Sequence, residues 1–193
     1  MYSLETLSVI NFELSSHCNS KCSQCPRYDM QGYVRADLNL QHLEFDIIRN
    51  LPTGEMKALK TISFCGNFGD PLMHPRLDQI IDLFPEQNIL INTNASLRNI
   101  KWWSKLGKKK NVEVTFCIDG LGKEHEMYRR NTSYTKIINN AKSYIQSGGK
   151  AKWQFIVFKH NEHQIQEAKK LSKDIGFEEI FFIYSDRFDT EDT

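Results

Sequence analysis

The chain has 193 residues, enough for one domain with a substantial core and scarcely enough for two. Its 25 Lys and Arg residues nearly balance its 24 Asp and Glu residues, and the resulting net charge of +1 argues against a dedicated nucleic-acid-binding protein. No apolar run is long enough to cross a bilayer, and the first residues lack the basic-then-apolar pattern of a signal peptide. We therefore expect a soluble, cytoplasmic protein.

Short β-branched or aromatic runs alternate with amphipathic stretches along the chain. The six expected strands are residues 7–14, 59–65, 88–94, 112–118, 152–158 and 178–184. The helical patterns between them are residues 38–51, 74–84, 99–107, 133–148 and 161–176. The first of these helices is placed by an apolar face of Leu40, Leu43, Ile47 and Leu51. No helical pattern follows the last strand.

This alternation predicts an α/β fold with a parallel sheet and right-handed crossovers. Six βα units suit either a doubly wound sheet or an incomplete TIM-type barrel, and periodicity alone does not separate the two. In both architectures the functional residues gather at the carboxyl ends of the strands. The residues that follow each strand are therefore the candidates for the site.

Three of the five cysteines, Cys18, Cys22 and Cys25, lie directly after the first expected strand. This cluster differs from the even, dispersed set of a secreted disulfide framework and favours metal binding in a reducing compartment. Structural zinc normally has four protein ligands, and His17 is an awkward fourth because it is adjacent to Cys18. An iron–sulfur cubane is favoured instead, since closely spaced thiolates on one loop can hold several corners of a cluster.

The spacing Cys18-x3-Cys22-x2-Cys25 after the first strand of a repeated βα chain resembles the radical S-adenosylmethionine (SAM) superfamily. The resemblance implies a [4Fe–4S] cluster held by these three cysteines, with the fourth iron bound by the amino and carboxylate groups of SAM. It also implies a partial, open TIM-type barrel of six parallel βα units, here without its last helix. The core domain is expected over residues 1–185, followed by an acidic tail at 186–193. Gln24 departs from the aromatic residue that the family often has there.

The turn after the second strand, "FCGNFGDPLMHP", is similar to the family's GGEP motif. Gly66 and Gly69 permit tight turning and close backbone approach to a ligand. The resemblance assigns Gly66, Asn67, Gly69 and Asp70 to SAM binding, with the Asp70 carboxylate accepting hydrogen bonds from the SAM ammonium. The alternative is an ordinary βα turn in which Asp70 caps the following helix.

Two further strand ends carry polar residues near the expected rim. Asn94, together with Asn92, is assigned by the resemblance to the ribose or methionine part of SAM, although Asn also favours turns for its own reasons. On the fifth strand, Gln154 is expected to point inward and Val157 to lie beside the adenine, and a merely buried strand is an equal alternative.

The segment "CIDGLGKEHEMYRR" after the fourth strand resembles the family's S-x-D-G segment and its following arginine. The resemblance assigns Asp119 to the ribose region and Arg130 to the SAM carboxylate, because a guanidinium offers a bidentate fork to a carboxylate. Arg129 is the competing candidate. Cys117 stands where the family commonly has a serine that contacts the ribose.

The resemblance implies reductive cleavage of SAM to methionine and a 5′-deoxyadenosyl radical that abstracts hydrogen from a peptide or a small molecule. It also implies a flavodoxin- or ferredoxin-like one-electron donor. Asn11 and Glu13 alternate with apolar residues on the first strand, so a polar substrate is expected beside them in the barrel interior.

The sequence most resembles the branch that carries an extra cysteine-rich SPASM or twitch domain, although no cysteines follow the last strand that could hold an auxiliary cluster. The alternative function is a non-catalytic iron–sulfur electron-transfer or binding module in which Cys65 or Cys117 closes the fourth corner. An uncovered last strand further predicts self-association, or a partner subunit, at the open edge of the barrel.

Overall fold

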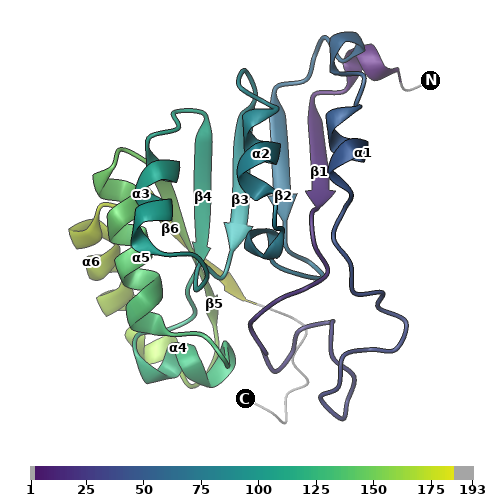
Figure 1. Ribbon diagram of the computed structural model, residues 1–193. Helices are drawn as coiled ribbons and strands as arrows, with labels where there is room; N and C mark the ends of the chain where they lie inside the picture. Colours follow the sequence, from purple (N-terminus) through teal and green to yellow (C-terminus); the bar gives the residue numbers. More distant parts are fainter. Residues whose placement is uncertain (1–2, 185–193) are drawn as a thin grey trace.

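The computed structural model describes residues 3–184, which form one six-stranded sheet of order β1-β2-β3-β4-β5-β6 (Figure 1). Every neighbouring pair is parallel. The strands are β1 (Val9–Glu13), β2 (Thr61–Cys65), β3 (Asn88–Thr93), β4 (Val112–Cys117), β5 (Lys150–Val157) and β6 (Glu179–Tyr184). Each expected strand is present. Because the strands follow chain order and the sheet stays open, the prediction of a partial TIM-type barrel is confirmed and a doubly wound sheet is excluded.

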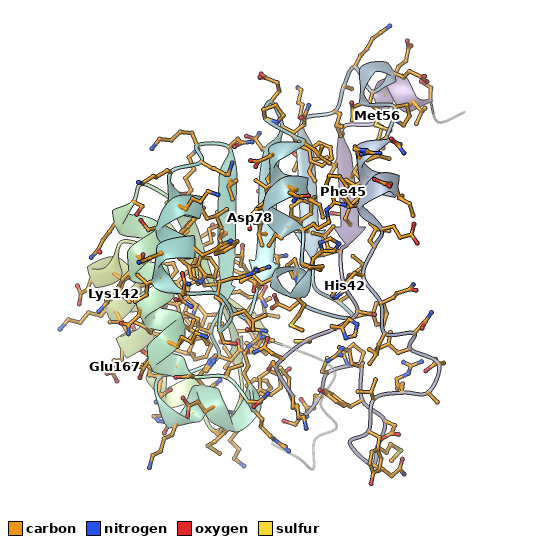
Figure 2. The ribbon with its side chains drawn as sticks, in the orientation of Figure 1. His42, Phe45, Met56, Asp78, Lys142 and Glu167 are labelled. Atoms are coloured by element: carbon orange, nitrogen blue, oxygen red, sulfur yellow. The ribbon has the colours of Figure 1, made fainter. Side chains whose placement is uncertain are left out.

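Helices lie along one face of this sheet (Figure 1). The α-helices are α1 (Phe45–Arg49), α2 (Leu77–Asp82), α3 (Ile100–Gly107), α4 (Lys123–Tyr128), α5 (Tyr134–Gln146) and α6 (Ile165–Ile175). Short 3₁₀ turns are η1 (Leu4–Thr6), η2 (Thr53–Glu55), η3 (Pro71–Met73) and η4 (Glu162–Gln164). Lys142 of α5 and Glu167 of α6 are exposed on the outer side of the helix layer (Figure 2).

The two faces of the sheet differ sharply in composition. The face under the helices is apolar and buried, with Ile62, Phe64, Ile91, Val114, Phe116, Trp153 and Phe155 at most 1% exposed. Alternate residues point to the other side, which we call the open face. It is largely polar and carries Asn11, Glu13, Ser63, Glu113, Thr115, Lys152 and Gln154, none of which is buried. The expectation that Asn11 and Glu13 point into the barrel interior agrees with this arrangement.

Aromatic packing joins β4 to the helices that cover it. The ring of Trp103 on α3 lies 5.1 Å from that of Phe116 and 6.0 Å from that of Tyr144 on α5, measured between centroids. The Tyr144 hydroxyl also donates to the carbonyl of Val112 at 2.9 Å. This cluster anchors the helix layer to the sheet and leaves the carboxyl ends of the strands for other contacts.

The helix expected over residues 38–51 is wrong for most of its length, since only Phe45–Arg49 is helical. The preceding backbone is used elsewhere: Ser16 N donates to the carbonyl of Gln41 and Leu43 N donates to that of Leu14, both at 2.9 Å. Two chain segments bridged in this way cannot also close helical hydrogen bonds. The apolar face was misassigned as well, because Ile47 is exposed and Ile48 is buried.

Helix α4, which the sequence did not predict, follows β4 and begins after Gly122 at φ 62°. Its sequence, KEHEMY, lacks an apolar stripe, so periodicity gave no signal. The expected acidic tail at 186–193 lies outside the described residues. Within residues 3–184, none of the helices has the length and apolar character that spanning a membrane requires.

Candidate functional site

A cavity of about 250 Å³ lies at the carboxyl edge of the sheet, between the loop after β1 and the ends of β2 to β5. Eight of the residues assigned to the site by the sequence line it: Cys18, Cys22, Cys25, Gly66, Asn67, Gly69, Asp70 and Asn94. Asp119 and Arg130 do not line it. The strand-end argument therefore brings together residues that are up to 76 positions apart, as in the contact of Asn94 with Cys18.

The loop after β1, which we call the cysteine loop (residues 14–27), presents all three clustered thiols to the cavity. Ser20 contacts two of these thiols. Its backbone N–H donates to Cys18 Sγ at 3.4 Å, and its hydroxyl lies 3.0 Å from Cys22 Sγ. Burial raises the pKa of Cys18 to about 12 and raises that of Cys25, partly opposed by a hydrogen bond from the Arg27 backbone. Binding of a metal to these thiols would therefore release protons.

The donor set fits a cluster better than a single ion. Among residues 3–184, no group of three His, Cys, Asp or Glu side chains is gathered closely enough to hold one metal ion. The three thiols nevertheless face one cavity, so they are spread around a common space. This spread suits ligands that each bind a different iron of a cubane.

The turn after β2 packs directly against the cysteine loop. A Cβ on Gly69 would lie 1.8 Å from the carbonyl oxygen of Ser15, so no other residue fits without displacing backbone. The next N–H, that of Asp70, donates to the His17 carbonyl at 2.8 Å. Glu13 at the end of β1 supports the turn, because its carboxylate accepts from Asn67 N at 3.0 Å. The glycine here is required by close approach of two backbones.

Asp70 is 3% exposed, and its carboxylate is already well bonded. It accepts hydrogen bonds from Leu72 N, the Thr93 hydroxyl and Asn94 N, all at 2.9 Å. Burial raises the pKa of Asp70, and these donors oppose that rise. The capping role considered from the sequence is therefore present, and Asp70 also joins β2 to the end of β3.

Asn94 is buried beside the cysteine loop. Its Nδ2 donates to Asn19 Oδ1 at 3.0 Å and lies 3.7 Å from Cys18 Sγ, while its Oδ1 accepts from the backbone and hydroxyl of Ser96. The Asn94 amide thus holds the loop that carries the first cysteine. Asn92, two residues earlier, also lines the cavity and is exposed.

Of the two neighbouring arginines, the one that lines the cavity is Arg129, the competing candidate from the sequence. Its Nε donates to Asp119 Oδ2 at 2.6 Å, and Asp119 Oδ1 accepts from Ile156 N at 2.7 Å. The Asp119 side chain is itself fully buried. Arg130 is exposed, and its carbonyl accepts from Lys21 N at 2.9 Å. The two neighbours differ because α4 ends at Tyr128 and turns only Arg129 inward.

Strand alternation decides the contribution of β5. Gln154 lines the cavity, as expected, and Ile156 lines it two positions later. Val157 points to the opposite, buried face, so it was placed against the period of two.

The sequence analysis missed several lining residues, among them Arg27 and Tyr128. Arg27 could have been found, because it follows Cys25 by two positions in the same loop. Tyr128 comes from the unpredicted helix α4. The isolated cysteines Cys65 and Cys117 also line the cavity, and burial is the main cause that raises their pKa values to about 11 and about 12.

No family model matches the chain. A curated relative, the Cysteine-type anaerobic sulfatase-maturating enzyme of Clostridium novyi (strain NT), is 26% identical over 201 residues, covering 93% of this chain and 51% of the relative. The chain therefore spans about half the length of the curated relative it matches.

Solved structures show the same fold. SuiB of Streptococcus suis bound to precursor peptide SuiA has 20% identity and a TM-score of 0.72, covering 91% of this chain and 38% of SuiB. The anSMEcpe structure with bound AdoMet has 17% identity and a TM-score of 0.72, covering 92% of this chain and 49% of that one. Methylornithine synthase (PylB) has 14% identity and a TM-score of 0.65, covering 94% and 54%. These neighbours are radical SAM enzymes, so the resemblance is confirmed and the chain has the fold of their core domain.

Substitution of Gly69 by Ala should destabilise the protein by about 1–3 kcal/mol, because the new Cβ forces the turn away from Ser15. The iron content after reconstitution should fall in parallel, since the cysteine loop is displaced. Gly54→Ala in η2 is the matched control, because its Cβ meets nothing within 4 Å. Urea unfolding and iron analysis of both variants make the comparison, and equal behaviour of the two would contradict the packing argument.

Acidification should destabilise the protein through His125. This side chain is buried, with Nδ1 accepting from Asp119 N at 3.1 Å and Nε2 lying 3.2 Å from the Thr132 hydroxyl. Burial, assisted by Arg129, lowers the pKa of His125 from 6.5 to about 3. The unfolded chain therefore takes up the proton first, and stability present above pH 6.5 is lost as the pH falls toward 3.

At pH 5 this loss should be about 2 kcal/mol for one histidine, at about 1.4 kcal/mol per pH unit. Urea unfolding at pH 7 and pH 5 measures it. His125→Gln should be less stable at pH 7 yet lose about 2 kcal/mol less than the native protein on acidification. The same pH dependence in both proteins would show that His125 is not the responsible group.

Proposed function

We propose that this radical SAM core domain binds a [4Fe–4S] cluster and SAM at the carboxyl-edge cavity and forms the catalytic core of an enzyme that modifies a peptide. The observation that supports the proposal most directly is the gathering of Cys18, Cys22 and Cys25 on one loop against a cavity that the turn after β2 also lines. When bound, the cluster and SAM would supply one-electron reductive cleavage of SAM to methionine and a 5′-deoxyadenosyl radical that abstracts hydrogen from the substrate.

The chain's own residues would hold and orient these groups. The three cysteines would bind three irons and leave the fourth for SAM. The turn at Gly66–Gly69 would bring backbone polar groups close to the ligand, because glycine leaves its backbone uncovered. The Asp70 carboxylate already accepts hydrogen bonds from three protein groups, so its first role is to shape the turn. Only its remaining lone pairs would be available to the SAM ammonium.

Arg129 replaces Arg130 as the proposed partner of the SAM carboxylate. Its Nε is engaged by Asp119, and a guanidinium has further donors on its terminal nitrogens. Asp119 then acts behind Arg129, fixing its orientation, and would not itself contact the ribose. Asn94 likewise acts by holding the loop beside Cys18. The exposed Asn92, on the open face beside these residues, is the asparagine available to a ligand.

A peptide is the proposed substrate class. SuiB was solved with the precursor peptide SuiA, and anSMEcpe was solved with bound AdoMet and Cp18Cys peptide. The open face of the present chain is largely polar and uncovered by helices over residues 3–184, and it leads to the cavity at its carboxyl edge. A peptide laid along this face would reach the radical site from the barrel interior. Methylornithine synthase is the precedent for the alternative, a small molecule.

The remaining partners follow from the same chemistry. Reductive cleavage needs one electron for each SAM consumed, so a flavodoxin- or ferredoxin-like donor is proposed. Edge strands offer unpaired backbone groups, so self-association or a partner subunit is proposed at the open edge of the barrel. Sedimentation of the reconstituted protein under anaerobic conditions tests the second of these, and a monodisperse monomer would contradict it.

Release of 5′-deoxyadenosine tests the proposed reaction. The protein is reconstituted anaerobically with iron and sulfide, reduced with dithionite and mixed with SAM. We expect 5′-deoxyadenosine and methionine in equal amounts, detected by chromatography. A reduced cluster that leaves SAM intact would favour the second candidate, a non-catalytic iron–sulfur module.

Cysteine variants of the reconstituted protein distinguish the two candidate functions. We expect Cys18→Ala, Cys22→Ala and Cys25→Ala each to lose most of the bound iron and sulfide, while Cys65→Ala and Cys117→Ala retain it. The second candidate is a specific possibility because Cys65 and Cys117 line the same cavity. Loss of the cluster in either of these two controls would identify a fourth protein ligand and overturn the proposal of an iron open to SAM.

A further inference from the structure

Arg27 is a buried cation whose hydrogen bonding is incomplete. The residue is 4% exposed, and its Nη2 donates to the carbonyl of Ser16 at 3.0 Å. Its Nε and Nη1 are shielded from solvent and have no hydrogen-bond partner among the described residues. None of the ion pairs within residues 3–184 includes Arg27. A buried charge without a partner is unfavourable, so the site calls for an anion.

The contacts that are present explain only the position of the side chain. The bond to Ser16 ties the end of the cysteine loop to its beginning, and the guanidinium carbon lies 5.6 Å from the centre of the Tyr28 ring. An arginine with a purely structural role would also use its remaining N–H donors in hydrogen bonds within the protein. Two of them instead stay unpaired at the wall of the cavity that Arg27 lines.

The anion that fits is the one the cysteines would hold. Arg27 follows Cys25 by two positions in the cysteine loop and lines the same cavity as the thiols of Cys18 and Cys25. Arg129, which also lines the cavity, is already neutralised by Asp119. Arg27 is thus the buried cation at the cavity that lacks a carboxylate partner among the described residues.

We infer that Arg27 is a positioning residue for the cluster, whose buried guanidinium offsets the negative charge of the thiolates and sulfides and raises the reduction potential. The inference rests on the proposed function, because it needs the cluster. Net charge and hydrogen bonds to sulfur are among the terms that set the potential of an iron–sulfur centre. An added electron increases the negative charge beside a fixed cation, so the cation favours the reduced state most.

The test compares the removal of a buried charge with the removal of an exposed one. Arg27→Gln removes the charge, Arg27→Lys retains it, and Lys21→Gln removes an exposed charge from the same loop. The cluster of each reconstituted protein is titrated anaerobically without SAM and followed by electron paramagnetic resonance. At the native midpoint potential, the ratio of reduced to oxidised cluster should fall at least about tenfold in Arg27→Gln, a shift of about 59 mV for one electron.

Arg27→Lys should lie between the native protein and Arg27→Gln, and Lys21→Gln should match the native protein because solvent screens its charge. A native potential in Arg27→Gln at native iron content would overturn the inference, and weaker SAM binding in that protein would reassign Arg27 to SAM. If Arg27→Gln cannot hold a cluster, equal failure of Arg27→Lys would show a purely structural role. A native protein that assembles no cluster would overturn the proposed function itself, and the inference with it.

Discussion

The contact between the backbone of Gly69 and the carbonyl of Ser15 is the constraint on which the carboxyl edge depends. It lets the turn after β2 lie flat against the cysteine loop, where the Asp70 N–H reaches the His17 carbonyl at 2.8 Å. The Asp70 carboxylate accepts a hydrogen bond from Asn94 N at the end of β3, and the Asn94 side chain in turn contacts the cysteine loop. Three strand ends are therefore joined in one closed circuit of hydrogen bonds. A loop of this length could not otherwise hold three thiols at a fixed cavity.

A second network holds the other half of the edge. Asp119, at the end of β4, accepts from Arg129 and from Ile156 N on β5, while its own N–H donates to His125 on α4. The neutral imidazole of His125 is used here as an acceptor, which explains why its burial is tolerated. In both networks a buried carboxylate is hydrogen-bonded to other groups of the protein. The groups left at the cavity include thiols, backbone polar groups of the turn after β2, the exposed amide of Asn92, the Gln154 amide and guanidinium donors.

The sequence predicted the strands well because each one carries a strong local signal. One face of the sheet is almost wholly apolar, and the open face alternates with it at a period of two. The cysteine loop and the turn after β2 were found by spacing and position. The errors arose where tertiary contacts overrule local pattern, as in residues 41–43, whose backbone bridges the residues after β1. The exchange of Arg130 for Arg129 has the same origin, because only the end of α4 decides which of two neighbours turns inward.

The charges around the cavity connect these two networks to the proposed chemistry. Asp70 is surrounded by donors and Asp119 is paired with Arg129, so neither carboxylate is left to neutralise Arg27. Protonated thiols do not neutralise it either, and burial favours that protonated form at Cys18. Deprotonation of the thiols by a bound cluster would place negative charge beside the cation, so that each compensates the burial of the other. The unpaired donors of Arg27 therefore destabilise the protein without a cluster, and binding of the cluster would remove that destabilisation.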